Sequence, residues 1–143
     1  PCMQTSYNKT EPVKIPETER ITYRRLTMEN LDFVCKTYRY GENDSRYLGD
    51  RISHGMIGAF DGNRCVGFIG EHNEGSMGIL EVIPEYRRRG IASVLESMMI
   101  NKKLKEGRIP YDHVVLGNDA SLGLQKSLGM DKAEGIVTWL FIK

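Results

Sequence analysis

Apolar positions recur along the chain with two different periods, and the change of period predicts strands in some segments and helices in others. Short apolar runs separated by turn residues predict strands at 21–26, 56–60, 65–69, 79–83, 111–116 and 136–142. Asp61-Gly62-Asn63 lies between the second and third of these runs. That tripeptide predicts a tight hairpin, because glycine accepts the positive φ that such turns require.

Helical periodicity follows or precedes these runs, at 31–40, 47–52, 90–106 and 118–128. We expect Asn30 to cap the first helix and Asn118 or Asp119 to begin the last. Lys102, Lys103 and Lys105 suit the negative end of the long third helix, which Gly107 is placed to terminate. Gly129 is placed to end the last helix in the same way. The order is therefore one strand, two helices, three strands, a helix, a strand, a helix and a strand.

Length and composition suit one domain. The chain has 143 residues, which is long enough to bury a single hydrophobic core. Its net charge of +1 gives no broad basic surface of the kind that nucleic-acid-binding proteins carry. Residues 1–20 are polar and contain Pro12 and Pro16, so we interpret them as an N-terminal arm or linker before a single domain at 21–143. Three scattered cysteines predict neither disulfides nor a metal site. No apolar run is long enough to span a bilayer, so we expect a cytoplasmic protein without membrane contact.

The segment Ile83-Pro84-Glu85-Tyr86-Arg87-Arg88-Arg89-Gly90-Ile91-Ala92 carries the chemistry. A strand ends at Pro84 and a helix begins near Gly90, where backbone N–H groups lack helical partners and face outward. Gly90 permits close approach to the backbone, and the three arginines add positive charge. This pattern predicts a cradle for a phosphate group. A solvated basic turn is the plainer interpretation. The segment is neither a Walker loop nor a G-x-G-x-x-G turn.

This run resembles the acyl-CoA-binding motif Arg/Gln-x-x-Gly-x-Gly/Ala of the GCN5-related N-acetyltransferase (GNAT) superfamily, with Arg87, Gly90 and Ala92 at its fixed positions. Asn118-Asp119-Ala120-Ser121, followed by Leu124, Leu128, Gly129 and Met130, is similar to the later helix motif of that superfamily. The glycine N-acyltransferase-like (FR47-like) branch is the most similar. It is suggested by Pro84-Glu85-Tyr86-Arg87, by Ile109-Pro110-Tyr111, and by His113-Val114 before Asn118. The match is strongest over about residues 76–130.

The resemblance implies an α/β (α+β) fold: a mixed, largely antiparallel sheet of six to seven strands, flanked by about four helices. The sheet would splay between its fourth and fifth strands, which end at Ile83 and Leu116. Acetyl-CoA or a related acyl-CoA would lie in the gap as co-substrate, with its pantetheine arm bonded to Val82 and Ile83 like an added strand. Its diphosphate would rest on Arg87 and the turn Arg88, Arg89, Gly90, Ile91, Ala92 and Ser93. Asn118 and Ser121 would face the pantetheine, although both could serve as helix caps alone.

The sequence offers three candidates for the catalytic base: Glu74, Glu81 and His113. Superfamily members often carry a glutamate at the position of Ser76, and Glu74 could share its face if the strand extends that far. Others place the acid at the position of His113, whose ordinary pKa suits a base at neutral pH. We favour His113 and Glu74 as catalytic residues over Glu81. A histidine on a strand is also often structural. For Glu81, a glutamate that is merely exposed on a strand would give the same sequence pattern.

Two further departures concern the remaining steps. The tyrosine that often protonates the leaving thiolate is Gln125 here, although Tyr111 could substitute. A backbone N–H at Val82 or Ile83 could hold the oxyanion. We therefore expect an N-acyltransferase acting directly on a small primary amine or an amino acid. The alternative is an acyl-CoA-binding or regulatory domain with little catalysis, and the apolar last strand with Trp139 could support a homodimer.

Overall fold

The computed structural model describes residues 2–15, 18, 20–38, 44–115, 124 and 128–132. Its strands are β1 (Cys2–Ser6), β2 (Ile21–Arg25), β3 (Ile57–Asp61), β4 (Arg64–Gly70), β5 (Ile79–Val82), β6 (Tyr111–Val115) and β7 (Asp131–Lys132). Its α-helices are α1 (Leu31–Thr37), α2 (Ser45–Gly55) and α3 (Ile91–Lys105). Two short 3-10 helices, η1 (Met28–Asn30) and η2 (Pro84–Tyr86), precede α1 and α3.

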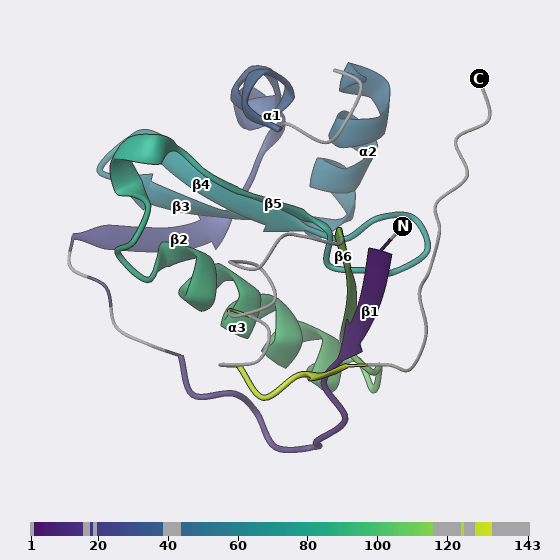
Figure 1. Ribbon diagram of the computed structural model, residues 1–143. Helices are drawn as coiled ribbons and strands as arrows, with labels where there is room; N and C mark the ends of the chain where they lie inside the picture. Colours follow the sequence, from purple (N-terminus) through teal and green to yellow (C-terminus); the bar gives the residue numbers. More distant parts are fainter. Residues whose placement is uncertain are drawn as a thin grey trace.

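The strands form two antiparallel sheets. One has the order β2-β3-β4-β5 and the other the order β6-β1-β7. Figure 1 shows α1 and α2 on one face of the larger sheet and α3 on the other, while β1 and β6 run steeply across its end. This mixed α/β arrangement confirms the expected class. The expected single sheet of six to seven strands was wrong, because β5 and β6 are edges of separate sheets.

Each face of the larger sheet has its own hydrophobic core. Side chains alternate between the faces of a strand, so Phe68 packs toward α1 and α2 whereas Ile69 packs with α3. The hairpin between β3 and β4 turns at Gly62, whose φ is +61°, as its sequence predicted. These two cores fix β4 and β5 between helical layers, and β5 leads directly into η2 and α3.

The N-terminal segment differs from the expected arm. Residues 2–6 form β1, which pairs antiparallel with β6 from Cys2 opposite Val115 to Ser6 opposite Tyr111. Further along, the side chain of Asn101 on α3 bonds both backbone groups of Val13, at 2.7 and 2.9 Å. The polar composition of residues 1–20 concealed this role, because a strand lined by polar residues shows no apolar alternation.

Helix boundaries follow the expected residues in part. Gly107 has a φ of +72° and ends α3 as predicted. Asn30 is the N-cap residue of α1 as expected, but its side chain makes no capping bond to that helix and accepts the N–H of Thr27 at 3.0 Å. Among the described residues there are three α-helices, and most of the expected fourth lies outside them, although Leu128 N–H donates to Leu124 O as in a helix. No helix in the described part of the chain is long and apolar enough to cross a bilayer.

Candidate functional site

The open edge of β5 is the first part of the site. Ile83 N–H donates to Val66 O on β4 at 2.9 Å. Because backbone groups in an antiparallel ladder alternate in direction, Val82 and Leu80 present their N–H and C=O groups to the other edge. The N–H of Ile83 is therefore used within the sheet, and the expected contact of Ile83 with an acyl-CoA stays a prediction. The sequence alone could not show the direction of these backbone groups.

A gap between two sheets lies along this edge. Met77 N–H donates to Tyr111 O at 2.9 Å, which joins the chain just before β5 to the start of β6. Beyond that bond, among the described residues, β5 and β6 do not pair and belong to different sheets. An extended ligand in the gap would meet the backbone groups of Leu80 and the N–H of Val82, which face away from β4, as an added strand meets a sheet edge.

The start of α3 is the second part of the site. Gly90 is the N-cap with a φ of +80°, and as a glycine it supplies no side chain to cap the helix. The first helical bond runs from Val94 N–H to Gly90 O at 3.1 Å, so the N–H groups of Ile91, Ala92 and Ser93 lack an acceptor within the helix. Three adjacent N–H groups thus lie at the positive end of the helix dipole, the arrangement on which the predicted anion cradle depends.

The arginines before this helix have separate positions. Arg87 donates from Nε to the carbonyl oxygen of Val82 at 3.0 Å, tying the loop to the end of β5. Arg88 has a φ of +64°, a left-handed conformation that costs a non-glycine residue about 1–2 kcal/mol. Backbone strain of this kind gathers at functional sites.

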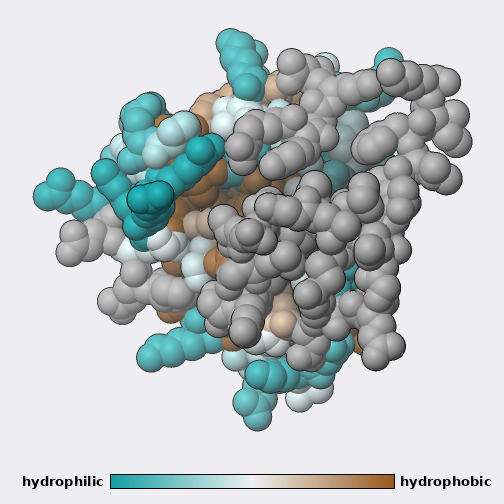
Figure 2. Space-filling model, viewed as in Figure 1, coloured by the Kyte–Doolittle hydropathy of each residue, from teal (hydrophilic) through white to brown (hydrophobic). Residues whose placement is uncertain are grey.

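Arg89 packs on an aromatic ring. Its guanidinium carbon lies 4.8 Å from the ring centroid of Tyr86, and Tyr86 donates to Asp61 Oδ2 on the hairpin at 2.5 Å. That hydrogen bond is the main reason why the pKa of Tyr86 is raised. Figure 2 shows polar side chains gathered on this side of the molecule, with apolar surface beside them. The cradle is thus built on a loop anchored to β3.

The turn between β4 and β5, residues 71–76, carries the third part of the site. Glu74 does not extend β5, which begins at Ile79, so that expectation was wrong. Its carboxylate nevertheless accepts the hydroxyl of Ser76 at 2.5 Å and the N–H of Ser76 at 3.2 Å. Ser76 is completely buried. A carboxylate therefore lies at the position where the resemblance implies a glutamate.

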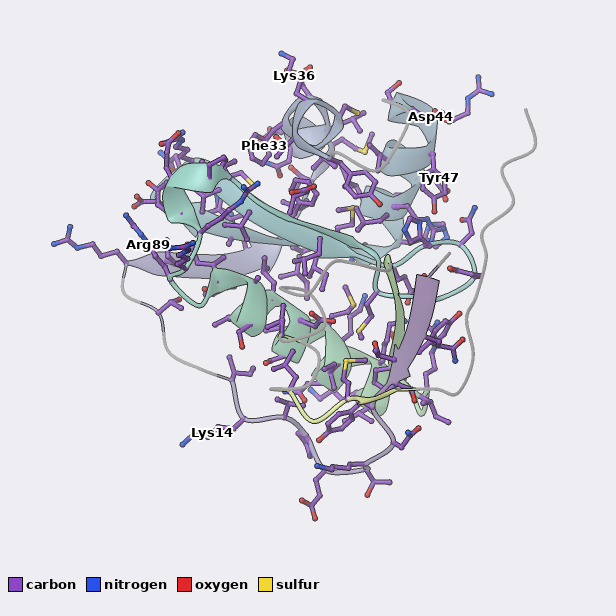
Figure 3. All side chains as sticks on the ribbon, in the orientation of Figure 1. Lys14, Phe33, Lys36, Asp44, Tyr47 and Arg89 are labelled. Atoms are coloured by element: carbon purple, nitrogen blue, oxygen red, sulfur yellow. The ribbon has the colours of Figure 1, made fainter. Side chains whose placement is uncertain are left out.

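Two more polar contacts surround this turn. The hydroxyl of Tyr111 donates to Glu74 O. Tyr47 on α2 lies 2.7 Å from His72 Nδ1 through its hydroxyl, and the two rings are stacked. Burial raises the pKa of both tyrosines. Figure 3 places Tyr47 and Arg89 at opposite ends of the larger sheet, so the turn and the start of α3 mark the two ends of the site. The Tyr47–His72 pair carried no sequence signal.

The remaining candidates are placed in part. The backbone of His113 lies in β6 opposite Gln4, but its side chain and residues Asn118, Ser121 and Gln125 lie outside the described residues. Glu81 is only 4% exposed, which contradicts the reading of an exposed strand glutamate. It shares a face of β5 with Ile79, which packs toward α1 and α2. Within the described residues, no group of three or more acidic, histidine or cysteine side chains is arranged to hold a metal.

The open strand edge and the start of α3 both lie in a segment that matches a known protein family. The FR47-like protein family matches residues 54–139, which include β3 to β6 and the whole cradle. The chain belongs to the FR47-like family. This branch lies within the GNAT superfamily, and solved GNAT acetyltransferases share the fold of the chain. No curated protein matches the chain.

Several solved structures are similar to this FR47-like chain. A Drosophila protein superposes with a TM-score of 0.84 at 22% identity, covering 92% of this chain and 47% of that one. A GCN5-related N-acetyltransferase from Sphaerobacter thermophilus gives 0.70 at 18% identity, with 92% and 47% covered. Naa50 of Arabidopsis thaliana, in complex with a bisubstrate analogue, gives 0.64 at 22% identity, with 77% and 82% covered. The chain thus spans about half the length of the first two.

Proposed function

We propose that this FR47-like chain is an N-acyltransferase that moves an acetyl or other short acyl group from coenzyme A to the primary amine of a small molecule. The observation that carries the proposal is the uncapped start of α3 at Gly90, beside the open edge of β5. Similar folds hold such ligands: Naa50 binds a bisubstrate analogue, and PaiA of Thermoplasma acidophilum, 21% identical with a TM-score of 0.61, binds coenzyme A. The chain covers 87% of PaiA, and PaiA covers 75% of this chain.

The residues of the site divide the work of binding. The N–H groups of Ile91, Ala92 and Ser93 would donate hydrogen bonds to the diphosphate oxygens of acyl-CoA, with Arg88 adding positive charge. The edge of β5 at Leu80 and Val82 would bond the pantetheine arm. Arg87 already occupies the Val82 carbonyl, so it fixes the distance between cradle and edge and leaves the Val82 N–H for the ligand. Asn118 and Ser121 remain proposed pantetheine contacts.

The reaction needs a neutral amine. An alkyl ammonium with a pKa of about 10.4 is protonated at neutral pH, so a base must take its proton before the nitrogen attacks the thioester carbonyl. Glu74, held at Ser76, is the described carboxylate best placed at the implied position, and His113 is the second candidate. The new C–N bond forms as the C–S bond breaks. A strand-edge N–H at Val82 or Leu80 would stabilise the oxyanion.

The thiolate needs no strong acid to leave. A free thiol has a pKa of about 8.5, and the absence of a tyrosine at Gln125 therefore slows the step without preventing it. Tyr111, whose hydroxyl lies at the Glu74 backbone, is a substitute proton donor. We propose a small amine or an amino acid as acceptor, in the cytoplasm, and a homodimer as the assembly.

Ser76 and Gln125, which depart from the superfamily pattern, favour a second candidate, an acyl-CoA-binding or regulatory domain with little catalysis. Calorimetry with coenzyme A, followed by thiol release from acetyl-CoA with a broad panel of amines and amino acids, separates the two. Binding with turnover supports the transferase. Binding without turnover across the panel supports the regulatory domain, and failure to bind coenzyme A would reject both.

A further inference from the structure

A buried lysine holds the turn that carries Glu74. Lys103 lies in the last turn of α3 and is 1% exposed, although its sequence position suggested a solvated charge at the helix end. Its Nζ contacts Glu71 Oε2 and donates to Gly75 O at 2.6 Å. One ammonium thus binds both the first residue of the 71–76 turn and the residue that follows Glu74.

Other cations complete the support of the turn. Arg108, which follows α3, donates from Nη1 to Glu71 Oε1 at 3.2 Å. Arg51 of α2 is 7% exposed and donates to the carbonyl of Glu71 at 3.3 Å. Burial works to raise the pKa of Glu71, but Lys103 and Arg108 outweigh it and the pKa lies below its ordinary value. Glu71 is therefore an ionised centre joined to α2, to α3 and to the segment before β6.

The path of the turn also depends on Gly75. Its φ is +104°, which side chains rarely tolerate, and an added Cβ would lie 2.7 Å from Arg108 Nη2. Gly75 N–H donates to His72 O at 2.9 Å. The turn therefore has little freedom to move Glu74 away from Ser76.

Burying a lysine is costly, and a buried ion pair often contributes little net stability. Burial lowers the pKa of Lys103, while its bonds to Glu71 oppose that change. We propose that Lys103 is a positioning residue, which fixes the 71–76 turn so that the Glu74 carboxylate is held at Ser76 to receive the proton of the acceptor amine. This inference rests on the proposed function and on Glu74 as its base. Lys103 itself touches neither substrate.

The first test separates catalysis from cofactor binding. Because small displacements of a catalytic group cost up to about a hundredfold in rate, we expect Lys103→Met to lower kcat about 10- to 100-fold. The Kd for coenzyme A should stay within about twofold, since the start of α3 lies at the other end of that helix. Lys105→Met removes the same charge two residues away at an exposed position and should change neither quantity.

The second test asks whether Lys103 acts through Glu74. In a double-mutant cycle on kcat, the variant with both Glu74→Ala and Lys103→Met should be no slower than Glu74→Ala alone. Once Glu74 is removed, Lys103 has no carboxylate left to position, so the two effects on kcat are not additive. The proposal would be overturned if the fold-losses in kcat of the two single variants multiplied in the double variant. It would also be overturned if Lys103→Met lowered kcat and coenzyme A affinity equally. An inactive Glu74→Ala with intact binding of coenzyme A supports the base, and a fully active one rejects both the base and its positioning.

Folding is controlled with a second variant. Glu71→Gln keeps hydrogen-bonding atoms but removes the charge that Lys103 and Arg108 share, and it should reproduce the selective loss of kcat if Lys103→Met does not fold. Should Glu71→Gln retain full kcat, the positioning role is rejected. The proposed function itself fails separately, if the unaltered chain neither binds coenzyme A nor releases thiol.

Discussion

Arg87 reaches back from the loop before α3 to donate its Nε hydrogen to the carbonyl of Val82, 3.0 Å away. This bond closes a short ring of chain between the end of β5 and the first free N–H groups of α3. The resemblance implied Arg87 as a diphosphate ligand. The structure shows that its Nε has a partner on the strand edge, and its contact with the diphosphate stays a prediction.

Replacing Arg87 should therefore loosen the cradle. We expect Arg87→Ala to weaken coenzyme A binding about tenfold, which corresponds to about 1.4 kcal/mol, a typical loss for a hydrogen bond from a charged donor. Arg25→Ala is the matched control, since Arg25 also donates to a backbone carbonyl, that of Ser53 at 2.9 Å. Calorimetry that finds the same Kd for both variants would contradict this role of Arg87.

Two glycines on the same helix allow backbone strain to be separated from binding. Gly90 and Gly107 have φ values of +80° and +72° at opposite ends of α3, so alanine at either should cost about 1–2 kcal/mol of folding stability. Only Gly90→Ala should also weaken the binding of coenzyme A, because only that end of α3 is proposed to form the cradle. Chemical denaturation and calorimetry on both variants measure the two effects, and equal affinities would count against the cradle.

The candidate bases can be ranked by turnover. Glu74→Ala and His113→Ala should each be assayed near neutral pH, and the true base should lose about 100-fold or more in kcat with its coenzyme A affinity intact. His54→Ala, which removes an exposed histidine on α2, serves as control. If neither Glu74 nor His113 matters, the buried carboxylate of Glu81 becomes the candidate to replace next.

Acid should loosen the 71–76 turn. The pKa of Glu71 is held below its ordinary value of 4.5, so its charged form stabilises the fold above that pH, and this contribution is lost as pH falls through the lowered value. The Tm of the unaltered protein should exceed that of Glu71→Gln near pH 6, and the difference should shrink below about pH 4.5. A constant difference would show that Glu71 does not titrate as inferred.

β1 can be tested without touching the site. Thr5 is 3% exposed and pairs with both Asp112 and Lys132, so Thr5→Pro removes a hydrogen-bond donor from the central strand of the smaller sheet. We expect a lower denaturation midpoint, measured by circular dichroism in urea. An unchanged midpoint would mean that β1 contributes little to the fold.

Local backbone requirements were readable from the sequence. Gly62 and Gly107 have the positive φ that their turn and terminating positions predicted, because glycine is favoured where other residues are strained. Apolar runs likewise located β3, β4 and β5. These signals depend on neighbouring residues alone, so they could be recognised in the sequence without knowledge of the fold.

Features set by distant contacts were missed. β1 pairs with β6, but its sequence is polar, and no local pattern records its partner. Lys103 and Glu81 are buried although their types favour solvent, because tertiary packing decides burial. The direction of the Ile83 N–H depends on ladder alternation in β5, which is visible only once Val66 is found opposite. The sequence thus located the helix start that the candidate site uses, and it missed the contacts that hold the 71–76 turn.

The pairing of β1 with β6 joins residues more than a hundred positions apart. During synthesis β1 is made before β6, which follows α3 in the sequence, so the backbone groups of β1 cannot pair with β6 until α3 has been made. Long-range strand pairing of this kind is formed slowly. We therefore expect the four-stranded sheet to assemble early around its own hairpin, and the smaller sheet to form later, so that the gap along β5 is completed only after β6 has been made.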